Sequence, residues 1–130
     1  MKGKIALTAA AALTLITPSI CAPAQAATER VKNSCFHARN ISNFRAPDNK
    51  TVYLRVGVRD IYQLDLFGAC PDVDWNEQIA VASRGGPWIC TGFDAEIISP
   101  SSIGPHRCQV RTVKKLTPTE VAALPKKARP

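Results

Sequence analysis

Four cysteines, at positions 35, 70, 90 and 108, constrain the fold of this chain more than any other feature of its sequence. A fifth, Cys21, lies in an N-terminal segment that we expect to be removed. An even set of cysteines in a small exported chain is typical of a domain held together by disulfides. None of the four forms a C-x-x-C pair, so the spacing favours neither a structural zinc site nor a redox centre. The sequence therefore predicts two structural disulfides.

The spacing alone does not select among the three possible pairings of these four cysteines. We favour Cys35–Cys108 together with Cys70–Cys90. The first bridge would join the start of the domain to its last strand, and the second would close a loop in the middle. In the loop-entropy model such bridges contribute roughly 3 kcal/mol for the short loop and 4 kcal/mol for the long one.

The N-terminal residues 1–26 have the pattern of a secretory signal peptide. Lys2 and Lys4 give a positive start, residues 5–16 are uncharged and rich in Ala, Leu and Ile, and residues 24–26 match a signal-peptidase site. The alternative is an uncleaved anchor, although the apolar run is short for a membrane span. We expect a periplasmic or secreted protein with no integral membrane span after cleavage.

Alternating apolar and polar residues indicate strands in much of the remaining chain. Residues 51–58 and 61–67 both alternate, with Val52, Leu54, Val56 and Val58 on one face of the first run, and they predict an antiparallel hairpin. Shorter apolar runs at residues 79–82, 88–90, 93–98 and 108–113 add further strands. The predicted fold is mainly β, a small β-barrel or β-roll of five to six short antiparallel strands with a short C-terminal helix.

The C-terminal helix is expected at residues 117–124. Thr117 is a candidate N-cap, Pro118 suits the first helical position, and Glu120 completes a capping box. The expected organisation is a signal peptide at 1–26, a loose segment at 27–34, one domain at 35–125 and a basic tail at 126–130.

Positive charge is concentrated near the C-terminus. The formal net charge is +7, and residues 107–130 carry seven Lys and Arg against a single Glu. Such a tail can bind anionic polymers or membrane lipids. We favour the alternative of a solvated, frayed terminus. The sequence has no aromatic-rich strand motif of the kind that stacks bases, so we expect no nucleic-acid partner.

Candidate binding residues are the aromatic and arginine side chains outside the predicted core. Exposed Trp, Tyr and Arg are favoured at binding surfaces, whereas the two tryptophans could equally cap the core. The candidates are Tyr53, Arg55, Arg59, Trp75 and Trp88.

The metal-ligand candidates form two sets, and neither is complete. His37 and His106 each lie two residues from a cysteine, and the favoured Cys35–Cys108 bridge would bring them together without a third ligand. Asp72 and Asp74 open like a calcium loop, but the glycine and the final acidic residue that such a loop requires are missing. We expect no metal and no cofactor.

The sequence predicts that the protein is not an enzyme. It contains no G-x-S-x-G elbow, and pairing of all four cysteines leaves no free thiol. A small enzyme using His37, His106 or Asp94 is the least favoured alternative. We expect a monomeric binding domain for an exported protein or a small ligand. The second hypothesis is an inhibitor of an exported hydrolase, such as a lysozyme or a protease, inserting the loop at 83–88 or at 99–106.

Several short motifs follow one another along the chain. They are Cys35-Phe36 followed by Arg39 and Ile41, the strand pair ending at Cys70, Cys90 followed by Asp94, and Arg107-Cys108-x-Val110 leading into Leu116-Thr117-Pro118. Their order resembles that in a family of small exported bacterial proteins classed as a domain of unknown function. The resemblance covers nearly all of the chain after the leader. It implies export and a shared four-cysteine framework, and it implies no particular activity.

Overall fold

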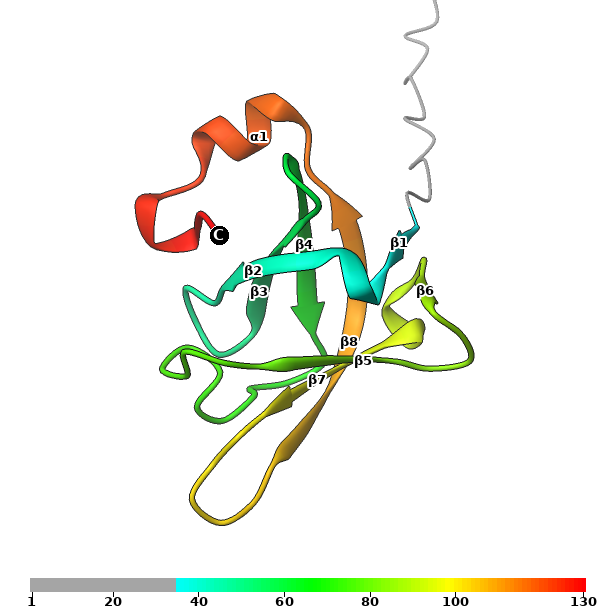
Figure 1. Ribbon diagram of the computed structural model, residues 1–130. Coiled ribbons are helices and arrows are strands. Elements are labelled where there is room, and N and C mark those ends of the chain that lie inside the picture. Colours follow the sequence, from blue (N-terminus) through cyan, green and yellow to red (C-terminus); the bar gives the residue numbers. More distant parts are fainter. Residues whose placement is uncertain (1–34) are drawn as a thin grey trace, which may run out of the picture.

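The structure is a computed structural model that describes residues 35–130. The predicted signal peptide at 1–26 and the predicted loose segment at 27–34 lie outside the described residues. The described part is mainly β, as predicted, with one six-stranded sheet, one two-stranded sheet and one short α-helix (Figure 1). Among these residues no helix is long and apolar enough to cross a membrane.

The main sheet is antiparallel and curls into a half-barrel with the strand order β2-β3-β4-β8-β7-β5. Its strands are β2 (Ile41–Arg45), β3 (Thr51–Val56), β4 (Asp60–Leu66), β5 (Ala80–Ser83), β7 (Ala95–Ser99) and β8 (His106–Lys115). The small sheet pairs β1 (Phe36–His37) with β6 (Trp88–Ile89). Three 3-10 turns, η1 (Ala38–Asn40), η2 (Gly92–Asp94) and η3 (Lys126–Ala128), and the helix α1 (Pro118–Ala123) complete the fold.

The predicted hairpin is formed by β3 and β4. Val52 lies opposite Leu64 and Leu54 opposite Tyr62, so the apolar positions of both strands share the inner face. Val58 departs from the prediction, because it is 87% exposed. The chain turns at Gly57, whose φ of 62° is in the left-handed region that glycine tolerates, and Val58 therefore belongs to the turn and not to the strand.

One hydrophobic core fills the concave side of the half-barrel. The small sheet covers it, since Phe36 in β1 is 3% exposed and its ring lies 4.5 Å from that of Tyr62 in β4. The core residues are Phe36, Val52, Leu54, Val56, Tyr62, Leu64, Leu66, Cys70, Val73, Ile89, Ala95, Ile97 and Val110. Burial of apolar surface at this interface stabilises the sheet by roughly 25 cal/mol for each Å² removed from water.

The structure has two disulfides, and their pairing corrects our prediction. The bonds are Cys35–Cys90 and Cys70–Cys108, instead of Cys35–Cys108 and Cys70–Cys90. Strand pairing is the physical reason. The small sheet places Cys35 beside Cys90. Because β4 pairs directly with β8, the segment after β4 carries Cys70 to Cys108.

The predicted capping box at the start of α1 is confirmed. Thr117 Oγ1 accepts a hydrogen bond from the Glu120 amide at 3.3 Å, and Glu120 Oε2 accepts one from the Thr117 amide at 2.8 Å. Lys114 Nζ lies 2.5 Å from the same carboxylate. Together these donors lower the pKa of Glu120 to about 2, with the Lys114 hydrogen bond as the largest cause.

The tail at residues 126–130 is packed against the domain, so the expectation of a frayed terminus is wrong. Ala128 in η3 is 1% exposed. Arg129 donates hydrogen bonds to the carbonyls of Ala122 at 2.7 Å and Leu124 at 2.8 Å, and Arg55 of β3 donates to the carbonyl of Pro130. The C-terminal segment therefore covers part of the outer face of the sheet, and its lysines remain exposed.

One other local prediction also changes. The segment at 93–98 is not one strand, because η2 occupies Gly92–Asp94 and β7 begins only at Ala95. The segment around Asp72 is a turn in which Asp72 has a φ of 61° and Val73 is fully buried. The carbonyl of Asp72 accepts hydrogen bonds from the amides of Trp75 and Asn76.

Candidate functional site

Two phenylalanines and an arginine form an exposed patch beside β8, which we call the aromatic surface. It consists of Phe67, Phe93 and Arg111. Phe67 is 49% exposed and Phe93 is 69% exposed, and their ring centroids lie 6.1 Å apart at an angle of 47°. Arg111 is exposed as well, with its guanidinium carbon 5.3 Å from the centre of the Phe67 ring. This distance is within the range of a cation–π contact.

Strand pairing fixes the Phe67 side of the aromatic surface. Phe67 directly follows Leu66, whose side chain points into the core, so the Phe67 side chain points outward. Its amide donates to the carbonyl of Gln109 at 3.1 Å, and its carbonyl accepts from Arg111 Nη2 at 3.2 Å. A register shift between β4 and β8 at Asp65 and Leu66 lies beside these contacts. Bulges of this kind often re-aim side chains near functional surfaces.

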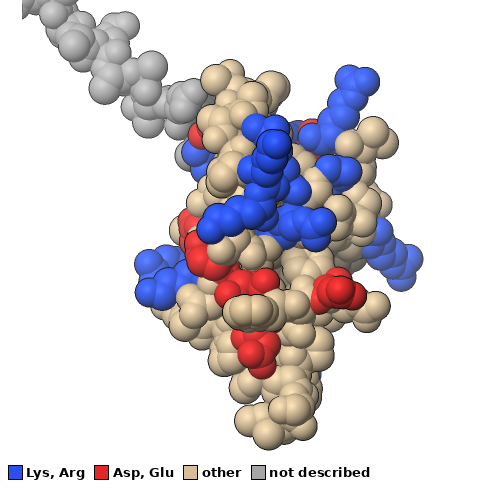
Figure 2. Space-filling view, turned by 90° about the vertical axis from the view of Figure 1, so that its left-hand side faces the viewer, with Lys and Arg blue, Asp and Glu red and all other residues tan. Residues whose placement is uncertain are grey.

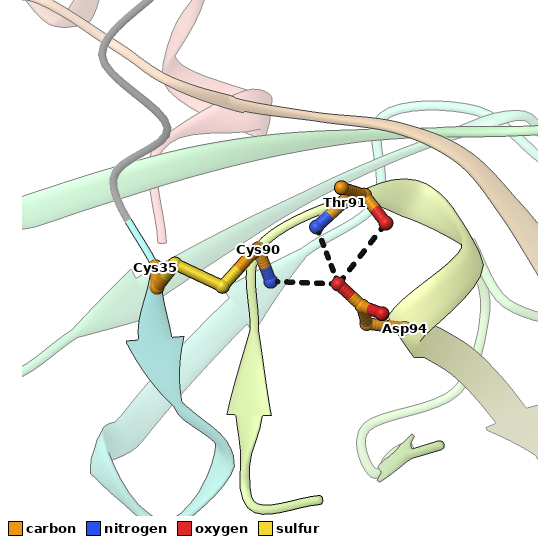
Figure 3. The surroundings of a disulfide bond; sticks show 4 residues. All are labelled: Cys35, Cys90, Thr91 and Asp94. Atoms are coloured by element: carbon orange, nitrogen blue, oxygen red, sulfur yellow. Dashed lines mark hydrogen bonds between the residues drawn. A yellow bond between two sulfur atoms is a disulfide. The ribbon is translucent and has the colours of Figure 1, made fainter. Parts of the chain in front are cut away.

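The turn η2 fixes the Phe93 side of the aromatic surface. A single oxygen of Asp94, Oδ2, accepts hydrogen bonds from the amide of Cys90 at 3.1 Å, the amide of Thr91 at 2.7 Å and the hydroxyl of Thr91 at 3.0 Å (Figure 3). These three donors favour the ionised carboxylate and lower the pKa of Asp94, with the backbone bond from Thr91 as the largest cause. Asp94 therefore anchors the turn.

A covalent bond holds the same turn from the other side. Cys90, whose amide binds Asp94, is bonded to Cys35 at the start of the small sheet (Figure 3). Gly92 packs directly on β8, and a Cβ at this position would lie 2.1 Å from the carbonyl oxygen of Arg111. Phe93 is thus presented by a turn that is fixed through a disulfide, three hydrogen bonds and a close backbone crossing. Such preorganisation lowers the entropic cost of binding.

The side chains of the aromatic surface are of the types that suit recognition. Aromatic side chains and Arg are enriched in the residues that contribute most to binding at protein interfaces. The rings supply apolar area, and the guanidinium supplies a fixed positive charge with several donors. A ligand complementary to this surface would have an apolar side chain next to a carboxylate.

The five predicted binding residues are not brought together. Tyr53 and Arg55 are half-buried on the outer face of β3, and Arg59 lies in the exposed turn between β3 and β4. Trp75 is 84% exposed in the loop after β4, whereas Trp88 is 56% exposed in β6 and its ring lies 5.4 Å from that of His37. The tryptophans do not cap the core, and each stands on a different part of the surface.

The predicted metal-ligand residues are also separate. His37 lies in the small sheet, where its Nδ1 accepts a hydrogen bond from the Arg39 amide at 3.2 Å. His106 begins β8 in the main sheet, opposite Ser99, so the expected approach of the two histidines does not occur. Asp72 and Asp74 are exposed in a turn. Within residues 35–130 no group of three or more His, Cys, Asp and Glu side chains could hold a metal ion.

Sequence reasoning missed the aromatic surface because it assigned Phe93 to a strand. The missed signal was the spacing Thr91-x-x-Asp94, which matches a capping box and predicts a turn start. Phe67 precedes a glycine at the end of an alternating run, and this pattern alone does not distinguish an exposed from a buried ring. Proximity of the two rings depends on the β4–β8 pairing, which is not a local signal.

The fold and this site define a small disulfide-bonded β domain with a rigid, exposed aromatic surface. Over residues 1–130 the chain matches the family described as "Family of unknown function (DUF6491)", and it belongs to that family. Comparisons with curated proteins and with solved structures find no match.

Proposed function

We propose that this protein is an exported, non-enzymatic binding domain that recognises a protein partner through the aromatic surface. The observation that carries the proposal is the pair of exposed rings, Phe67 and Phe93, held beside Arg111 by a turn with little freedom to move. Exposed apolar side chains scattered singly need no explanation, but a fixed cluster that includes an arginine is typical of an interaction site.

Export is the second part of the proposal, and it rests on independent features. Disulfides persist in oxidising compartments, and this domain has two. The pattern of residues 1–26 fits a secretory leader. The proposed location is therefore the periplasm or the exterior of a bacterial cell.

The test compares partner capture by three forms of the purified protein under native conditions. Wild type, Phe93→Ser and Val58→Ser are immobilised and exposed to the same extract of exported proteins. Val58 is the matched control, because it is an apolar side chain that is 87% exposed in a turn away from the aromatic surface. We expect a partner that wild type and Val58→Ser retain and that Phe93→Ser loses, and this partner must then bind the purified protein directly. Equal capture by all three forms would argue against the aromatic surface.

A second candidate function, inhibition of an exported hydrolase, is favoured by the loop between β7 and β8. The hairpin extends from the body of the domain (Figure 1), and Ile103 near its tip is 88% exposed. Ser101 Oγ donates to the Gly104 carbonyl at 2.7 Å, and the Ser101 carbonyl accepts from the Gly104 amide at 3.2 Å. At the base of the loop, Asn76 Nδ2 donates to Ser99 Oγ at 2.7 Å.

A projecting loop with internal hydrogen bonds and an apolar tip suits insertion into an enzyme cleft, because it is ordered before binding. The other loop considered, residues 83–88, has no such apolar tip. Inhibition of a panel of lysozymes and proteases tests this candidate. Inhibition that Ile103→Asp removes and Phe93→Ser retains would support it, and no inhibition at high concentration would exclude it.

A further inference from the structure

An open apolar groove lies between the β3–β4 turn and the C-terminal helix, and none of its lining residues belongs to the aromatic surface. It has a volume of about 650 Å³, which is within the range of small-molecule sites. The residues that line it are Arg59, Asp60, Lys115, Leu116, Pro118, Val121, Ala122 and Arg129. We call it the C-terminal groove.

The lining of the C-terminal groove divides into an apolar part and a charged part. Leu116, Pro118, Val121 and Ala122 supply the apolar part, and they come from the end of β8 and from α1. None of these four side chains has a hydroxyl, thiol or imidazole group. The apolar part of the groove is thus suited to an aliphatic chain.

The charged part of the groove is positive. Lys115 Nζ lies 2.8 Å from Asp60 Oδ2 and forms an ion pair with it. Asp60 is the one acidic residue of the lining, so its charge is already neutralised. Arg129 donates to the backbone carbonyls of Ala122 and Leu124, and none of the ion pairs among residues 35–130 includes it. The side chain of Arg59 has no hydrogen bond or ion pair with any described residue and is exposed. Figure 2 shows basic side chains gathered on the part of the surface where the C-terminal segment lies.

We infer that the C-terminal groove binds a long-chain fatty acid. The aliphatic chain would lie on Leu116 and Val121, and the carboxylate would be bound by Arg59 and Arg129. Charge complementarity selects an anionic head group, because the lining carries three cations and a single carboxylate. The apolar part selects a chain over a compact polar anion, since each methylene buried against it adds to the binding free energy. The inference is independent of the proposed partner of the aromatic surface.

The test is calorimetric titration of the purified protein with myristate, with tetradecanol and tetradecyltrimethylammonium as probes of the same chain length. We expect micromolar binding of myristate with one molecule per chain. The neutral probe should bind about fivefold more weakly, the upper end of what an exposed ion pair contributes. The cationic probe should bind more weakly still. Equal binding of all three probes would show non-specific apolar adsorption and overturn the inference.

Two variants locate the binding. Arg59→Ala should weaken myristate binding about fivefold. Val121→Glu should abolish myristate binding, because the new carboxylate places a charge in the apolar part of the groove and has the same sign as the myristate head group. Arg39→Ala is the matched control, since Arg39 is exposed in η1 and does not line the groove. Unchanged binding by Val121→Glu would overturn the inference.

Sedimentation of the same proteins tests the other occupant that such a groove allows. A wild-type dimer that Val121→Glu converts to a monomer would show that a second copy of the chain fills the groove, and this result would also overturn the inference. A monomer in both forms, together with selective myristate binding, would support it.

Discussion

Gly92 lies so close to Arg111 that a Cβ on Gly92 would stand 2.1 Å from the Arg111 carbonyl oxygen and 2.2 Å from its carbonyl carbon. Both neighbouring atoms belong to the backbone of β8, so neither can rotate away. The crossing of η2 over β8 requires glycine at this position. It also sets the distance between Phe93 on the turn and Phe67 beside the strand.

Gly92→Ala should therefore destabilise the domain. Relief of the overlap needs a backbone shift of η2 or β8, and overpacking of this kind costs about 1–3 kcal/mol. Urea unfolding followed by circular dichroism measures the loss. Gly68→Ala is the control, because a Cβ at Gly68 would have no heavy atom within 4 Å, its chain neighbours aside. Equal stability of the two variants would show that the crossing is looser than described.

Removal of the Cys35–Cys90 bridge should weaken the pairing of β1 with β6, because the bridge joins the ends of these two strands. The bridge spans 55 residues, and the loop-entropy model assigns about 4 kcal/mol to a loop of this length. The double variant Cys35→Ser, Cys90→Ser should lose about that much stability in urea unfolding. Hydrogen exchange should show lost protection first in β1 and β6, since two residue pairs alone connect these strands. Protection that remains unchanged there would contradict this account of the bridge.

The capping box of α1 should make the free energy of unfolding depend on pH. Because the folded pKa of Glu120 is lowered from 4.5 to about 2, the ionised carboxylate stabilises the fold above about pH 4.5. This stabilisation is lost as the pH falls through the folded pKa. Glu120→Gln should thus be less stable than wild type at neutral pH, and the difference should shrink between pH 4.5 and 2. Glu77→Gln, which changes an exposed carboxylate without a hydrogen bond or ion pair to any described residue, should show no such trend.

The C-terminal segment should detach when its buried anchor is changed. Ala128 is 1% exposed, so Ala128→Asp places a charge where water is excluded. We expect a loss of about 1–3 kcal/mol and faster proteolysis after residue 125. Ala123→Asp, at an exposed position of α1, should resemble wild type in both measurements. Equal proteolysis rates for the two variants would mean that the segment is not held by Ala128.

Local patterns predicted those parts of the fold that depend on neighbouring residues. The alternation in β3 and β4 identified the hairpin and its inner face, and Thr117, Pro118 and Glu120 identified the helix start. Val58 was misplaced because strict alternation ignores the left-handed turn at Gly57. The mainly β fold class followed from the same patterns.

Long-range relationships could not be predicted from these patterns. The disulfide pairing follows from β1 pairing with β6 and from β4 pairing with β8, and neither pairing has a local signature. The aromatic surface depends on the same β4–β8 contact, which explains why its residues were missed. Arg59 was predicted as a binding residue from its type alone, and the groove beside it became visible only with the packing of α1.

Photo-crosslinking in living cells tests the central claim most directly. A benzoylphenylalanine placed at residue 93 samples the aromatic surface at native concentration, and the same group at residue 58 samples another exposed apolar position elsewhere. We predict a crosslinked protein of defined mass from position 93 that position 58 does not give and that Arg111→Ala weakens. The absence of a crosslink from position 93, or identical crosslinks from both positions, would contradict the claim that this surface recognises a partner.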